Sequence, residues 1–172
     1  EIKTLFQTGK GYGNAIRAGI NNVGTEYLCI FNADGSFDPN DLIELLKKCQ
    51  SYDFVFASRY LKNGGSKDDT ILTKFGNFFF TSLGNFFFSL NLSDILYTYV
   101  IGKTNSFKSL NLKSDDFCLC VEIPINAVRL KHLFTDFPSF ERKRIAGKKK
   151  VNEFVDGFKI LFFMIKKFIH LK

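Results

Sequence analysis

The chain has 172 residues, of which 45% are hydrophobic, and its formal net charge is +7. This length and hydrophobic content exclude an intrinsically disordered chain and predict one domain with a sizeable core. The positive charge indicates an anionic partner or surface, such as nucleic acid, anionic lipid or a phosphorylated substrate. No signal peptide is visible, and no apolar run reaches the roughly 18 residues of a membrane-spanning helix.

The first third of the chain alternates strand-like and helix-like segments at short intervals. The apolar patterns predict strands at 2–6, 27–31 and 53–57, with helices at about 12–22 and 39–49 between them. This order predicts parallel strands joined by right-handed crossovers, and the carboxyl ends of such strands share one edge of the sheet. We therefore expect three polar loops to meet at that edge, namely Gly9-Lys10-Gly11, Asn32 to Ser36, and Ser58-Arg59.

The loop after the strand at 27–31 contains a cluster of oxygen-bearing side chains. Asn32 and Asp34 directly follow the apolar run, and Asp38-Pro39 is typical of a helix start. Oxygen ligands suit a hard cation such as Mg²⁺ or Mn²⁺, which in turn holds phosphates. Taken alone, this stretch is equally consistent with an ordinary polar loop between a strand and a helix.

The glycine-rich loop at 9–11 is a weaker signal. Its G-x-G-x-G spacing matches neither the dinucleotide-binding pattern nor the P-loop pattern. Phosphate binding by the amides at the start of the following helix and a plain turn are both consistent with it.

Two features follow in the middle of the chain. A polar loop at 62–69 is expected to lie over the site. The Phe triplets at 78–80 and 86–88 are eight residues apart, a little over two helical turns, so both fall near one helix face. A core helix and a lipid-facing helix are both consistent with this pattern.

The last third of the chain carries charges in unusual settings. Glu122 stands among apolar neighbours in a helix predicted within 117–134, so it is either a partnered buried carboxylate or a catalytic one. Six of the ten residues at 141–150 are basic, which predicts an anion site, or otherwise a solvated loop. From about residue 154 the polar side chains fall within an arc of about 100°. Such a helix lies either in a membrane interface or on the protein's own core.

The four cysteines (Cys29, Cys49, Cys118 and Cys120) stand in apolar or helical contexts. Only Cys118 and Cys120 are close in sequence, and their C-x-C spacing lacks a second ligand pair. Buried free thiols are therefore favoured over a zinc site.

Together these motifs resemble family 2 glycosyltransferases with the GT-A fold. Within that family, the chain is most similar to dolichol-phosphate-mannose-synthase-like enzymes and to related polyprenyl-phosphate or polysaccharide glycosyltransferases. The resemblance runs through Gly9-Lys10-Gly11, Asn32 to Ser36 with Asp38-Pro39, Ser58-Arg59-Tyr60, Gly64-Gly65, Gly76-Asn77, Asp94, Glu122, and Pro138 to Glu141 continuing to Arg144 and Gly147.

The resemblance implies an α/β fold with a GT-A-like (Rossmann-like), mostly parallel sheet and flanking helices. The chain would comprise a partial GT-A domain at 1–150 and an amphipathic carboxy-terminal helix at 151–172. Glu1 is not Met, and the family's first strand and base-binding loop have no counterpart here, so we expect an amino-terminally truncated domain.

The same resemblance implies the site residues. A D-x-D-like motif in this family holds a divalent metal against the nucleotide-sugar diphosphate. Here Asp34 stands at the second acidic position of this motif and Asn32 at the first, so the metal site has one negative charge fewer than in the family motif. The metal would be Mg²⁺ or Mn²⁺. The expected donor- or phosphate-binding residues are Gly9, Lys10, Gly11, Arg59, Arg144 and Lys150. The expected catalytic residues are Asp34, Arg144 and Glu122, the last as a base for a hydroxyl acceptor.

The expected function is transfer of a sugar from a nucleotide-sugar donor to a lipid-linked (polyprenyl phosphate) or polysaccharide acceptor, as in cell envelope biosynthesis. The enzyme would be cytoplasmic and peripheral at the inner face of the cell membrane. The alternative is a catalytically incomplete fragment or degenerate copy that binds a membrane or partner without turnover. Nucleic acid is not an expected partner, because the basic loop lacks interleaved aromatic residues and no nucleic-acid motif is present.

Overall fold

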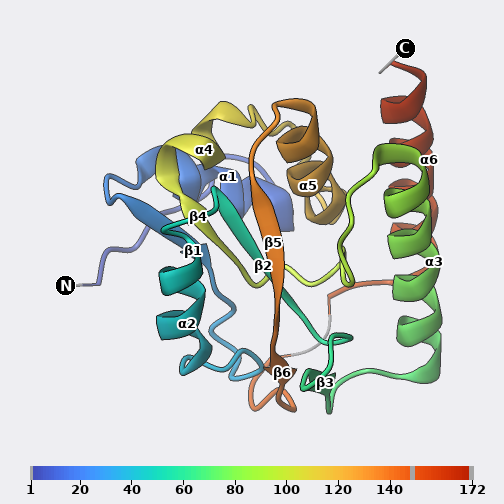
Figure 1. Ribbon diagram of the computed structural model, residues 1–172, viewed down its shortest axis with the longest axis horizontal. Helices are drawn as coiled ribbons and strands as arrows, with labels where there is room; N and C mark the ends of the chain where they lie inside the picture. The colour runs from blue at the N-terminus through green and yellow to red at the C-terminus, as the bar shows by residue number, and fades with distance from the viewer. Residues whose placement is uncertain (1, 148–149, 171–172) are drawn as a thin grey trace.

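The computed structural model describes residues 2–147 and 150–170. Its centre is a four-stranded sheet with the order β1-β4-β2-β5, shown in Figure 1. The strands are β1 (Tyr27–Ile30), β4 (Val100–Lys103), β2 (Phe54–Ser58) and β5 (Phe134–Pro138). A small second sheet pairs β3 (Gly65–Ser66) with β6 (Phe140–Glu141).

The main sheet is mixed, which corrects the expectation of a mostly parallel one. Strand β4 is antiparallel to both β1 and β2, and only β2 and β5 pair in parallel. Strands β1 and β2 still run in one direction, as the sequence pattern predicted, and β5, which the sequence pattern did not predict, runs the same way. The difference arises because β4, a short strand far along the chain, inserts between β1 and β2.

The strand predicted at 2–6 does not form. These residues have no regular secondary structure, and Ile2 and Phe6 are 97% and 89% exposed. An apolar run becomes a strand only where it finds a neighbouring strand for its backbone groups, and none of the strand pairs in the described chain includes this segment.

Six helices complete the described chain. They are α1 (Tyr12–Asn22), α2 (Asp41–Lys48), α3 (Ile71–Phe88), α4 (Thr104–Ser109), α5 (Leu119–Arg129) and α6 (Glu153–Ile169). Helices α1, α2 and α5 fall within the ranges predicted from the sequence. Of these helices, none is long and apolar enough to cross a membrane.

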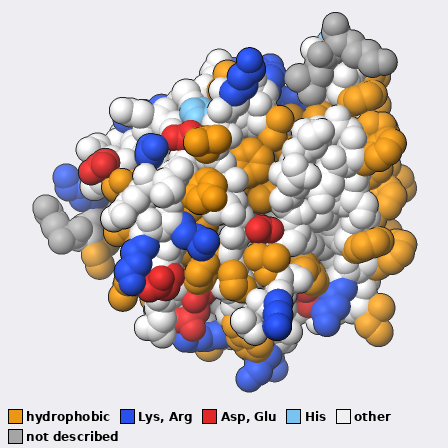
Figure 2. Space-filling model, viewed as in Figure 1, with side chains coloured by type: hydrophobic (Ala, Val, Ile, Leu, Met, Phe, Trp, Pro, Cys, Tyr) orange, Lys and Arg blue, Asp and Glu red, His pale blue; other side chains and the backbone are white. Residues whose placement is uncertain are grey.

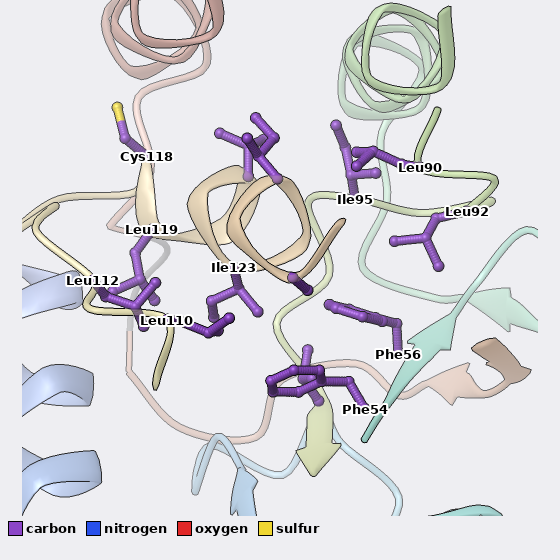
Figure 3. Packing of buried hydrophobic residues seen from close by; sticks show 14 of the residues in the cluster. Phe54, Phe56, Leu90, Leu92, Ile95, Leu110, Leu112, Cys118, Leu119 and Ile123 are labelled. Carbon is purple, nitrogen blue, oxygen red and sulfur yellow. The ribbon is translucent and has the colours of Figure 1, made fainter. Parts of the chain in front are cut away.

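Successive residues of a strand point to opposite faces of the sheet. Both faces are buried here, each under its own hydrophobic core. Phe54 and Phe56 of β2 join the larger core with Ile123 of α5 and with Leu90 and Leu92, as Figure 3 shows. Val55 and Ala57 face the opposite way and join the second core under α2, which includes Leu45 and Tyr99. The sheet is therefore covered on both sides and holds its loop ends in fixed positions.

Helices α3 and α6 pack side by side at one end of the molecule (Figure 1). The Phe87 and Phe168 rings lie 4.9 Å apart between centroids. Each Phe triplet is divided between core and surface: Phe80 and Phe88 are buried, whereas Phe78 and Phe86 are 71% and 81% exposed. One phenylalanine of each triplet therefore packs in the core, and the other two are exposed at the surface.

The cysteines occupy apolar surroundings. Cys49, Cys118 and Cys120 are buried and Cys29 is partly buried. Burial raises the pKa of the Cys118 and Cys120 thiols to about 12 and that of Cys49 to about 11. These thiols are therefore neutral core groups at physiological pH.

Candidate active site

A cavity of about 570 Å³ lies beyond the carboxyl end of β1, between the loops of the sheet and the first turns of α3 and α6. It has two kinds of wall. One is polar and includes Asn32, Asp34, Arg59, Asp68, Asp69, Glu141, Arg144 and Lys150. The other is apolar and includes Leu72, Phe75 and Phe80 from α3, with Phe154 and Ile160 from α6.

Asp34 is held in place by its own loop. Its Oδ1 accepts hydrogen bonds from the Ser36 amide (3.0 Å) and the Ser36 hydroxyl (2.7 Å). Burial opposes ionisation of this carboxyl, but the Ser36 bonds and the Arg144 charge outweigh it, so its pKa lies below the usual value. Asp34 is therefore a carboxylate at neutral pH.

Arg144 reaches Asp34 because two distant segments are joined through their backbones. The Arg142 amide donates to the Ser36 carbonyl (2.8 Å), and the Ile145 amide donates to the Asp34 carbonyl (2.9 Å). The Arg144 guanidinium then lies 3.4 Å from Asp34 and 3.6 Å from Asp68, measured from nitrogen to carboxylate oxygen. Both separations are long for charge-assisted hydrogen bonds, so Asp34 and Asp68 hold the guanidinium by charge and leave it facing the cavity.

Asn32 lies beside Asp34 in the same cavity. The Tyr12 hydroxyl lies 2.6 Å from the Thr98 hydroxyl and donates to Asn32 Oδ1 at 3.5 Å. Among the described residues, no three His, Cys, Asp or Glu side chains gather to hold a metal ion. One carboxylate and one amide oxygen nevertheless suit Mg²⁺, which commonly takes most of its other ligands from substrate phosphates and water.

Arg59 forms the centre of a buried ion network in the cavity wall. Its Nε lies 2.7 Å from Asp94 Oδ2, and its Nη1 lies 3.1 Å from Glu141 and 3.2 Å from Asp69. Its guanidinium also lies 4.7 Å from the centroid of the Tyr97 ring. Burial disfavours the charged form, but Asp94 and the other carboxylates outweigh it and hold the Arg59 pKa well above its usual value. Arg59 therefore connects Asp69 and Glu141, which line the cavity, with the buried Asp94.

A family model, Glycosyl transferase family 2, matches residues 1–110. The chain belongs to glycosyl transferase family 2. Membership implies the GT-A fold, a nucleotide-sugar donor and an acceptor, and enzymes of this family often use divalent metal ions. Comparison with curated proteins gave no match.

The structure of this family 2 protein gathers five of the residues expected at the site: Asn32, Asp34, Arg59, Arg144 and Lys150. Of the three loops expected to meet, those after β1 and β2 do so. The loop at 9–11 does not line the cavity, since no strand at 2–6 delivers it to that edge of the sheet. Lys10 and Gly11 instead line a second hollow beside α6.

Glu122 also lies outside the cavity lining. Its side chain is fully buried and accepts hydrogen bonds from the Lys113 amide (3.1 Å) and the Ser114 amide (2.8 Å). Lys167 of α6 lies 3.4 Å away and supplies the opposite charge. These contacts give the buried Glu122 carboxylate the partners that it needs in apolar surroundings. They agree with the first of the two interpretations of the sequence, a partnered buried carboxylate.

We predict that Glu122→Gln lowers the free energy of unfolding by about 1–3 kcal/mol, because a neutral amide weakens these charge-assisted bonds in a buried setting. Urea unfolding measures this change. Transfer activity per folded molecule should stay within a factor of about three of the unmodified protein. A folded variant of unchanged stability that loses activity a hundredfold would contradict this account and restore the catalytic interpretation.

Other cavity residues escaped sequence reasoning. Tyr12 and Thr98 are far apart in the chain and meet only in the fold. Asp68 and Asp69 are the last residues of the polar loop at 62–69. Asp68 forms an ion pair with Arg144 and Asp69 forms one with Arg59, and the pairing of β3 with β6 brings these segments together. Adjacent carboxylates in a loop expected over the site were the signal that could have indicated them.

Proposed function

We propose that the protein transfers a sugar from a nucleotide-sugar donor to the phosphate of a lipid-linked acceptor, a polyprenyl phosphate. The observation that carries this proposal is the two-sided cavity. Its polar wall offers Asp34, Arg144 and Lys150 to phosphates, and its apolar wall between α3 and α6 suits a hydrocarbon chain.

The proposed chemistry follows from these groups. An acceptor phosphate oxygen attacks the anomeric carbon of the sugar, and the bond to the nucleoside diphosphate breaks with its electron pair staying on the diphosphate. Arg144 binds phosphate oxygens through two parallel N–H groups, and Lys150 adds a positive charge. A divalent metal held by Asp34 and Asn32 would neutralise charge on the departing diphosphate. An ionised phosphate acceptor needs little help from a base, unlike a hydroxyl.

Calorimetric titration with a panel of nucleoside diphosphates in the presence of Mn²⁺ tests the donor half of this proposal. We expect Arg144→Ala to weaken binding at least tenfold, because a charge-assisted hydrogen bond contributes about 1.5–3 kcal/mol. Arg142→Ala is the matched control, since Arg142 pairs with Asp38 and does not line the cavity. Equal affinity in both variants would contradict the phosphate assignment. Tight binding without turnover would support the incomplete, non-catalytic alternative.

We further propose that the exposed side of α3 and α6 contacts a lipid bilayer. Both helices leave large apolar side chains outside, and these gather along the right-hand edge of the molecule in Figure 2. They are Ile71, Leu72, Phe75, Phe78, Phe79, Phe86 and Phe87 on α3, with Phe154, Val155, Phe158, Phe162, Ile165 and Ile169 on α6. We call this surface the apolar face. Two arguments favour a bilayer: the positively charged chain suits anionic lipid, and the same helices line the cavity that would take a lipid acceptor.

Lys148 and Lys149, which the sequence placed in a basic segment before α6, lie outside the described residues. Lys150 is described, exposed and part of the cavity wall. It links the phosphate-binding wall to the start of α6.

Replacing Phe75, Phe78, Phe158 and Phe162 together by serine should reduce partitioning onto anionic vesicles at least a hundredfold. Each phenylalanine that leaves water contributes up to about 1.5–3 kcal/mol, and partial insertion gives a fraction of that. Vesicle sedimentation measures the effect. The control is Ile43→Ser with Leu133→Ser, two exposed apolar residues outside the apolar face. Unchanged partitioning, or a lipid-free dimer that the four substitutions dissociate, would show that another occupant covers this face.

A further inference from the structure

A second hollow, of about 510 Å³, lies between the start of α1, the turn at 114–116 and the outer side of α6. It shares no lining residue with the candidate active site. Lys10, Lys159 and Lys166 line it, together with Phe162 and Phe163. The fold therefore brings a lysine from the glycine-rich loop next to two lysines more than 140 positions further along the chain.

The charges around this hollow favour an anion. Asp115 and Asp116 also line it. The Asp115 carboxylate already binds the Arg17 guanidinium (2.6 Å) and the Asn14 amide (2.9 Å), so its charge is compensated. Asp116 accepts a hydrogen bond from the Cys118 amide (3.0 Å). Lys159 lies 3.7 Å from Asp156, a separation too long for a hydrogen bond. With Arg17, four cationic side chains therefore stand against three carboxylates around this hollow, which leaves one excess positive charge.

The backbone at the start of α1 adds to this positive potential. The helix begins after Gly11, and no side chain caps it. Gly11 has φ of 108°, and a Cβ there would come within 2.1 Å of the Asp115 carbonyl oxygen. Glycine thus lets the loop pack against the turn at 114–116. The Asn14 amide of this turn donates to the Asp115 carbonyl (3.1 Å), and the partial positive charge at the start of the helix supplements the three lysines.

The position of the hollow indicates which anion reaches it. Lys159 and Lys166 are seven residues apart in α6, so they lie on the same side of the helix, about two turns apart. That side borders the apolar face, since Phe162 is 70% exposed and also lines the hollow. On a helix lying in a membrane interface, lysines at the border of the apolar face sit at the depth of the lipid headgroups.

We propose that this hollow binds the phosphate of an anionic phospholipid headgroup, with the lipid's acyl chain lying against Phe162. The site is separate from the acceptor site and would fix the orientation of the protein on the membrane, so that the cavity faces the bilayer. The inference rests on the membrane contact proposed above. A free phosphate or a nucleoside diphosphate carries the same chemistry, and the experiment therefore compares these sources.

The test uses short-chain lipid in solution, which needs no membrane contact. Dihexanoyl phosphatidylglycerol, below the concentration at which it forms micelles, should shift the NMR amide signals of Gly11 and Ser114, which both line the hollow. Dihexanoyl phosphatidylcholine should shift them at least tenfold less. Lys10→Gln/Lys159→Gln/Lys166→Gln should weaken the phosphatidylglycerol response at least tenfold. Lys3→Gln/Lys48→Gln/Lys62→Gln removes the same charge from exposed positions outside the hollow and should change it less than twofold.

Three results would overturn the inference. The first is no phosphatidylglycerol shift at Gly11 and Ser114. The second is an equal response in the two triple variants. The third is an equal response to inorganic phosphate or a nucleoside diphosphate at the same concentration, which would make the hollow a soluble-anion site. Retained vesicle partitioning and nucleoside diphosphate binding in the same samples would show that the proposed function stands while this inference fails.

Discussion

Asp34→Asn is expected to lower kcat/KM for sugar transfer by about 10²–10³, the usual effect of removing one group that stabilises transition-state charge. The substitution removes the carboxylate charge at the end of β1 while an amide oxygen can still accept the Ser36 hydrogen bonds. The loss should therefore appear in transfer and in metal-dependent nucleotide binding, with little change in the unfolding midpoint.

The matched control is Asp38→Asn. Asp38 lies four residues further along the same loop, pairs with Arg142 and does not line the cavity. It should keep transfer within about threefold, because an exposed ion pair contributes only about 0–1 kcal/mol. Asn32→Asp should strengthen Mn²⁺ binding by restoring the missing charge. If metal affinity is the same in Asn32→Asp and Asp34→Asn as in the unmodified protein, neither residue holds the metal.

Asp94→Ala is expected to destabilise the fold by about 3–5 kcal/mol. The Asp94 side chain is fully buried and binds Arg59 through both carboxylate oxygens. Its loss leaves a buried guanidinium with part of its hydrogen bonding unmet, and Glu141 and Asp69, at 3.1 and 3.2 Å, still favour its charged form. Urea unfolding gives the free energy. The urea m-value should stay unchanged, which separates lost stability from a change in the unfolded state.

Asp115→Ala provides the comparison for this second prediction. It also removes one partner of an arginine, but Asp115 and Arg17 are both partly exposed. We expect a cost below about 1 kcal/mol. If Asp94→Ala cost no more than Asp115→Ala, the Arg59 network would not be what holds the cavity wall together.

Local sequence patterns located the polar end of the site. The apolar run of β1 stops before Asn32, so this loop could be placed without a structure, although α2 begins at Asp41 and not at Pro39 as the Asp38-Pro39 pair predicted. The cation site expected in this loop was inferred from Asn32 and Asp34, which are only two positions apart in the sequence. The same patterns located the helices on both sides of the sheet.

Other features depend on distant contacts that local patterns do not encode. Strand β4 inserts between β1 and β2 because of pairings across the sheet, so the chain order of the early strands could not reveal a mixed sheet. Arg59 binds Asp94 and Glu141, which lie 35 and 82 residues further along the chain. Its guanidinium, expected to bind phosphate, is consequently engaged by carboxylates. Likewise, Lys10 lies near α6, and this follows only from the packing of α6 beside the loop.

The most direct test of the central proposal is transfer of labelled sugar into lipid. The protein is incubated with a panel of labelled nucleotide sugars and with anionic vesicles that contain a polyprenyl phosphate, and the label in the organic phase is then counted. We predict that label from one nucleotide sugar enters the lipid fraction only when polyprenyl phosphate is present, and that Asp34→Asn lowers this transfer by about 10²–10³. Label that instead enters a soluble polysaccharide, at a rate independent of polyprenyl phosphate, would contradict the account.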